Sequence, residues 1–126
     1  MNKVTSTTAS AERETWDLIG SDKVEGTRVY GSDGEHIGHI ERLMIGKRDG
    51  QVAYAVLAFG GFMGIGKNYY PLPWSALTFN DRLGGYEVSV TEDQLREAPS
   101  YIADDEWNWA DRAVGRRVDD YWRTIN

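Results

Sequence analysis

An eight-residue run without charge, VAYAVLAF at residues 52–59, dominates the pattern of hydrophobic and polar positions along the chain. Its residues are rich in strand formers, so the run predicts a strand that is buried on both faces. A glycine-rich segment, GGFMGIG, follows at 60–66, and residues 67–70 resume as a strand before Pro71 and Pro73 end regular pairing. This succession indicates a sheet that closes on itself.

The segments on either side alternate with the period of two that is typical of strands. Strands are predicted at 28–30 and 36–45, and the pairs Asp33-Gly34 and Asp49-Gly50 suit tight hairpin turns between consecutive strands. Two more strands, at 77–79 and 86–90, follow the proline corner. We therefore predict a mainly β chain that forms a small antiparallel β-barrel of about six strands with short C-terminal helices.

Two helices are predicted after the last strand. Thr91 and Gln94 fit a capping box that begins a helix ended by Pro99. Residues 104–114 predict a second helix with an acidic first turn, and Gly115 is expected to end it. The remaining apolar residues have helical spacing in a segment too short to be stable alone, so it must pack on its own barrel or on a second subunit.

The chain of 126 residues suits one domain with flanking segments. We expect an N-terminal tail at 1–23, partly without fixed structure because its start is polar and small. The barrel is expected at 24–101. An aromatic, acidic and helical C-terminal extension is expected at 102–126.

Composition narrows the classes of partner and compartment. A net charge of −6 argues against a nucleic-acid backbone as partner, because affinity for phosphates comes chiefly from clustered Lys and Arg. The chain has no cysteine and no apolar run near the ~20 residues that span a bilayer, so we expect neither disulfides nor a membrane span. The start lacks the apolar core of a signal peptide, which makes the cytoplasm the expected location.

Motifs that suggest catalytic or ligand chemistry are incomplete. Residues 61–67 fit the phosphate-loop spacing, but Asn68 replaces the magnesium-binding hydroxyl and the prolines forbid the required helix. His36 and His39 are expected on opposite faces of a strand, and the acidic residues 104–106 lack the spacing of a calcium loop. We therefore predict no enzyme activity and no catalytic, cofactor-binding or metal-binding residue.

Three motifs together resemble the PRC-barrel family, which is named for the cytoplasmic domain of the photosynthetic reaction centre H subunit. They are DGxxIGxIxxLMI from residue 33, VAYAVLAFGGFMG from residue 52 and YxLPWSAL from residue 70. The resemblance spans about Val24–Tyr101, and the extension is similar to that of bacterial stand-alone members. It implies a small barrel used as a docking or regulatory module, with no catalytic residues to carry over.

The favoured hypothesis is a non-catalytic module for protein interaction that self-associates, as a symmetric dimer, and also binds an unknown protein partner. The alternative is a domain that binds a small molecule or a lipid headgroup through aromatic residues around a pocket. Soluble monomers rarely expose so much aromatic surface. The candidate interaction residues are Phe62, Met63, Ile65, Tyr69, Tyr70, Trp74, Trp107, Trp109, Tyr121 and Trp122.

Overall fold

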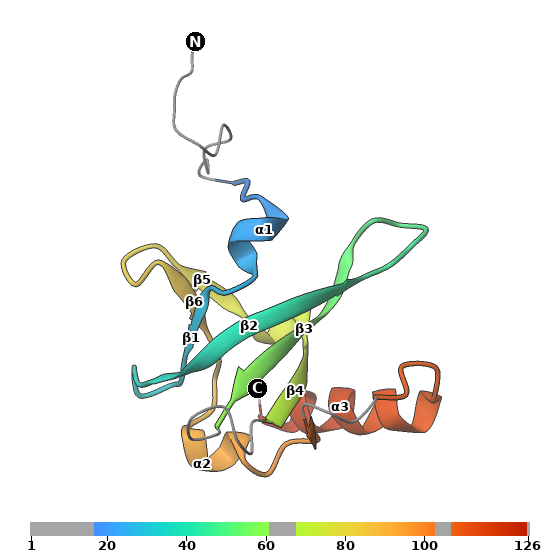
Figure 1. Ribbon diagram of the computed structural model, residues 1–126. Helices are drawn as coiled ribbons and strands as arrows, with labels where there is room; N and C mark the ends of the chain where they lie inside the picture. The colour runs from blue at the N-terminus through green and yellow to red at the C-terminus, as the bar shows by residue number, and fades with distance from the viewer. Residues whose placement is uncertain (1–16, 61–67, 103–106, 126) are drawn as a thin grey trace.

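The computed structural model describes residues 17–60, 68–102 and 107–125, and its centre is one seven-stranded sheet (Figure 1). The strand order is β5-β6-β1-β2-β3-β4-β7. All neighbouring strands are antiparallel except β1 and β6, which pair in parallel. The strands are β1 (Arg28–Tyr30), β2 (His36–Ile45), β3 (Val52–Phe59), β4 (Asn68–Pro73), β5 (Thr78–Asn80), β6 (Gly85–Glu87) and β7 (Tyr101–Ile102).

Strands β1 to β4 follow one another as the predicted antiparallel meander. Gly34 has a φ of 84° and Gly50 a φ of 71°, so both predicted hairpins are confirmed at the positions that require left-handed backbone. The mainly β, barrel-like fold is likewise confirmed. The sheet has seven strands instead of about six. It does not close on itself as expected, because β5 and β7 stand at its two ends in the described chain and do not pair with each other.

Short helices lie on both sides of this sheet (Figure 1). Helix α1 (Ser21–Val24) lies on the opposite side from α2 (Glu92–Leu95) and α3 (Arg112–Ile125), and the 3-10 helix η1 (Trp74–Ala76) follows β4. The predicted capping box is confirmed, because the Thr91 side chain accepts from the Gln94 amide while the Gln94 side chain accepts from the Thr91 amide. The strand predicted at 86–90 is shorter and ends at Glu87.

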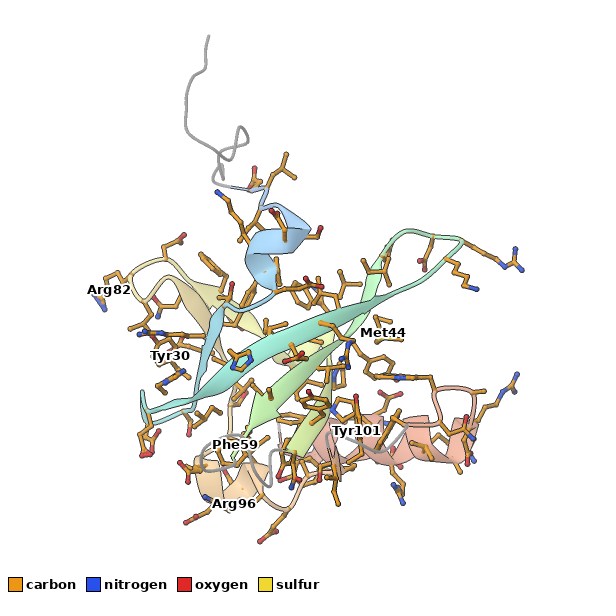
Figure 2. All side chains as sticks on the ribbon, in the orientation of Figure 1. Tyr30, Met44, Phe59, Arg82, Arg96 and Tyr101 are labelled. Atoms are coloured by element: carbon orange, nitrogen blue, oxygen red, sulfur yellow. The ribbon has the colours of Figure 1, made fainter. Side chains whose placement is uncertain are left out.

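The core lies between the sheet and these helices. Its buried side chains come from five strands, β1, β2, β3, β4 and β6, and from helices α1, α2 and α3, and they form one continuous cluster. Arg96, the C-cap residue of α2, lies over the Phe59 ring, 5.1 Å from its centroid, and closes the core at the end of β3 (Figure 2). The largest fully buried side chains are Trp122, Ile40, Leu57, Leu72 and Leu95.

The predicted helix boundaries in the C-terminal extension are wrong. Residues 107–111 are not helical, residues 104–106 lie outside the described part, and α3 begins at Arg112 and passes through Gly115 to Ile125. The Asp111 carboxylate accepts from the Ala113 amide at 2.9 Å, which places the start of the helix after Asp111. Tertiary packing sets the length of the helix, because Val118 and Trp122 are buried in the core.

The sequence left two places open for the C-terminal extension, its own barrel or a second subunit, and the structure shows the first. Helix α3 packs on β4 of its own chain, and Trp122 is 1% exposed there. The aromatic extension therefore completes its own barrel, and no crossing to a neighbour is needed to cover this part of it.

Gly115 provides a test of the corrected helix. A Cβ at this position would meet only the Tyr54 hydroxyl, at 3.9 Å, which is ordinary van der Waals contact. Because glycine weakens a helix interior, Gly115→Ala should raise the free energy of unfolding by about 0.5–1 kcal/mol in urea titrations. If Gly115 ended the helix in left-handed backbone, the same substitution would lower stability instead.

Candidate functional site

The extension brings tryptophan rings against tyrosines of the sheet and forms a continuous row. Tyr69 of β4 contacts Tyr101 of β7 with 5.4 Å between ring centroids, and Tyr101 contacts Trp107 at 5.2 Å. Trp107 contacts Trp109 at 6.2 Å, and Trp109 contacts Tyr54 of β3 at 5.5 Å. We call these five residues the aromatic row; Tyr101, at its second position, is labelled in Figure 2. Tilted and edge contacts of this kind stabilise ring positions.

A cation lies at the Tyr69 end of the aromatic row. The Arg42 guanidinium of β2 is 5.5 Å from the Tyr69 ring centroid, and Arg42 Nη1 is 3.5 Å from the Tyr101 hydroxyl oxygen. Glu41 Oε2 lies 4.0 Å from Arg42 Nη2, at the limit of an ion pair. The Arg42 side chain remains 44% exposed, so it keeps hydrogen-bonding capacity for a partner.

The other end of the aromatic row connects the sheet to α3. The Tyr54 hydroxyl donates to Asp119 Oδ1 at 3.1 Å. Burial, followed by the nearby Asp119 charge, raises the pKa of the Tyr54 hydroxyl above its ordinary value of 10.0. Burial also raises the pKa of Tyr101 and of Tyr121, whose hydroxyl donates to the Gln94 carbonyl. The Tyr54 and Tyr121 hydroxyls are donors, so they fasten α3 to the rest of the chain in their protonated form.

This arrangement predicts a loss of stability in alkali. A tyrosine whose pKa is higher in the folded chain than in the unfolded chain stabilises the fold fully below the unfolded pKa, near pH 10. This contribution is lost as the pH rises through the folded pKa. The free energy of unfolding should therefore fall above about pH 10, and less steeply in Tyr54→Phe. Urea titrations between neutral and alkaline pH measure this, and equal slopes for the two proteins would contradict it.

Three of the predicted interaction residues meet in the aromatic row, namely Tyr69, Trp107 and Trp109. Two others belong to the interior: Tyr70 is buried against Phe59, and Trp122 of α3 is buried in the core. The remaining predicted residues in the described chain are half-buried. The Trp74 ring contacts Tyr86, and the Tyr121 ring contacts Trp122. Phe62, Met63 and Ile65 lie outside the described residues.

Sequence reasoning missed the other members of this surface, which are Tyr54, Tyr101 and Arg42. Tyr54 stands in the charge-free run, where all side chains were expected to be buried alike, yet it is half-buried on the outer face. Burial along β3 does not alternate, because residues 52–54 are exposed or half-buried and residues 55–59 are all buried, so the pattern of the run contained no signal that singled out Tyr54.

Candidate metal ligands do not gather in the described residues. Within the part of the chain that the structure describes, no three His, Cys, Asp or Glu side chains are grouped so as to hold a metal ion. His39 instead lies 3.5 Å from Glu41 at the surface. Among the described helices, none is long and apolar enough to cross a membrane.

Comparison with known proteins bears on the barrel more than on the aromatic row. No curated protein matches the chain. The family model of the PRC-barrel domain matches residues 17–95, which is more than half of the chain and includes strands β1 to β6 and helix α2. Strand β7 and helix α3 lie beyond the match. The chain thus belongs to the PRC-barrel domain family.

Proposed function

We propose that this chain is a non-catalytic interaction module that self-associates through the aromatic row. PRC-barrel domains are known as modules for interaction and are generally not catalytic. Three rings of the row, Tyr101, Trp107 and Trp109, lie beyond the residues that match the family. The extension therefore adds to the common barrel a surface of its own.

The exposed Trp109 ring is the observation that carries this proposal. It is 37% exposed, although it is held between Trp107 and Tyr54. A rigid aromatic ring that is already ordered loses little conformational entropy on binding, and Trp and Arg are enriched at the centres of interfaces. Trp109 and Arg42 together give the row an aromatic anchor and a cationic one.

The order of groups along the aromatic row suits a two-fold dimer. Arg42 lies over Tyr69 at one end, whereas Trp109 lies beside Tyr54 at the other. If two rows meet in antiparallel orientation, Arg42 of each copy approaches Trp109 of the other and can form a cation–π contact. Each such contact occurs twice in a symmetric dimer, so the interface is self-complementary.

Sedimentation velocity over a range of protein concentrations tests the proposal. The unchanged chain should form a dimer, and Trp109→Ser should weaken the dimer at least about tenfold, as expected for an anchor residue. Leu83→Ser is the matched control, because Leu83 is 42% exposed but lies outside the aromatic row, between β5 and β6. A monomer at all concentrations, or equal weakening by both substitutions, would contradict self-association through the row.

A further inference from the structure

We propose that the charged groups at the two ends of the aromatic row select a second copy of the chain, with Arg42 of each copy paired to Asp119 of the other. The inference rests on the proposed self-association and names the residues that determine its specificity. Arg42 lies over Tyr69 at one end of the row. At the other end the Asp119 carboxylate accepts from the Tyr54 hydroxyl. The row therefore ends in a cation on one side and in an anion on the other.

The Arg42 guanidinium has unused hydrogen-bonding capacity at its end of the row. It lies 3.5 Å from the Tyr101 hydroxyl oxygen and 4.0 Å from Glu41 Oε2, both of which are long contacts. Glu41 is also shared with His39, whose Nε2 lies 3.5 Å from Glu41 Oε1. A guanidinium has five N–H donors in a planar fork that fits a carboxylate. Arg42 can therefore bind a carboxylate of another molecule without losing a strong ion pair of its own chain.

The Asp119 carboxylate has matching capacity at the opposite end. It is exposed on α3 and accepts from the Tyr54 hydroxyl at 3.1 Å, whereas an ionised carboxylate has about four acceptor sites. Arg123, one turn further along α3, pairs with Asp120 at 2.7 Å instead. None of the ion pairs in the described part of the chain includes Asp119. Most of its acceptor capacity is therefore open to a cation of another molecule.

Two-fold symmetry satisfies both ends of the row at once. When two rows meet in antiparallel orientation, each Arg42 reaches the Asp119 end of the other copy, so the ion pair forms twice. Parallel rows would oppose Arg42 to Arg42 and Asp119 to Asp119, and like-charge repulsion disfavours this arrangement. A partner that carries charge of only one sign would leave one end unmatched. Charge complementarity thus favours a second copy, and it favours one orientation of that copy.

Charge reversal at each end, followed by sedimentation velocity, tests the inference. Arg42→Asp opposes Asp119 of the other copy with a second carboxylate, and Asp119→Arg opposes Arg42 with a second guanidinium. Each variant alone should self-associate about tenfold or more weakly than the unchanged chain, because the repulsion occurs twice in a dimer. An equimolar mixture of the two variants should form a mixed dimer, since each end of one variant then meets the opposite charge on the other.

Two matched controls carry the same changes of charge at other places. Asp120→Arg reverses the neighbouring carboxylate of α3, which is 68% exposed and pairs with Arg123. Arg82→Asp reverses an exposed arginine between β5 and β6, which Figure 2 shows well away from Tyr101 of the row. Both controls should weaken the dimer clearly less than the reversals at the two ends of the row, because they change the net charge of the chain equally without opposing like charges in the interface.

The outcomes separate this inference from the proposed function. Arg42→Asp and Asp119→Arg variants that dimerise as tightly as the unchanged chain would overturn the ion pair and leave self-association intact. A mixture that remains monomeric, although circular dichroism shows both variants folded, would show that Arg42 and Asp119 do not face each other. An unchanged chain that is itself monomeric at all concentrations would contradict the proposed self-association, and the ion pair with it.

Discussion

Trp122→Ala should lower the free energy of unfolding by about 3–5 kcal/mol, the cost of removing a large aromatic side chain from a packed core. Trp122 is 1% exposed and packs in the core cluster beside Val118. Its loss would also free α3, which is too short to be stable without its contact with β4. Urea unfolding followed by far-UV circular dichroism measures the change.

Trp109→Ala is the matched control for that substitution, because Trp109 is also a tryptophan of the extension but is 37% exposed. It should cost clearly less than Trp122→Ala, since Trp109 buries less of its surface in the folded chain. If the two substitutions cost the same, or if Trp122→Ala leaves the stability unchanged, α3 does not complete the core of its own barrel.

Gly38→Ala should cost about 3 kcal/mol or more, because the added methyl group would collide with the backbone of the neighbouring strand. A Cβ on Gly38 would lie 2.2 Å from the Ala58 carbonyl oxygen and 3.1 Å from Leu57 Cδ1. The two central strands β2 and β3 would have to separate at this point to accommodate it.

The melting temperatures of Gly38→Ala and Gly115→Ala should therefore move in opposite directions. The two variants carry the same substitution, but the new methyl group meets the backbone of β3 at Gly38, whereas at Gly115 it has space and stands in a helix interior that favours alanine. A Gly38→Ala protein as stable as the unchanged chain would show that β2 and β3 do not approach each other as closely as the structure indicates.

The sequence predicted those parts of the fold that depend on neighbours in the chain. The hairpins at Gly34 and Gly50 require left-handed backbone, which an Asp-Gly pair supplies locally. The capping box of Thr91 and Gln94 is likewise formed within four residues. Local chemistry was sufficient to place these elements and to indicate a mainly β fold.

Features that depend on distant segments were not predictable in the same way. The parallel pairing of β1 with β6 and the addition of β7 beside β4 join residues far apart in the chain. Helix α3 passes through Gly115 because burial of Val118 and Trp122 outweighs the low helix propensity of one glycine. The aromatic row was predicted in part. Its tryptophans are recognisable by type, but the contact of Trp109 with Tyr54 and the contact of Tyr69 with Arg42 depend on strand register.

The central claim is that the extension folds onto its own barrel and presents the aromatic row to a second copy. Intermolecular NOEs in a mixture of ¹³C-labelled and unlabelled chains test it most directly. We predict intermolecular NOEs between Trp109 and Arg42, while the contacts between Trp109 and Tyr54 stay intramolecular. Intermolecular NOEs between Trp109 and Tyr54 would show an exchanged tail, and no intermolecular NOE in the row would contradict the proposed interface.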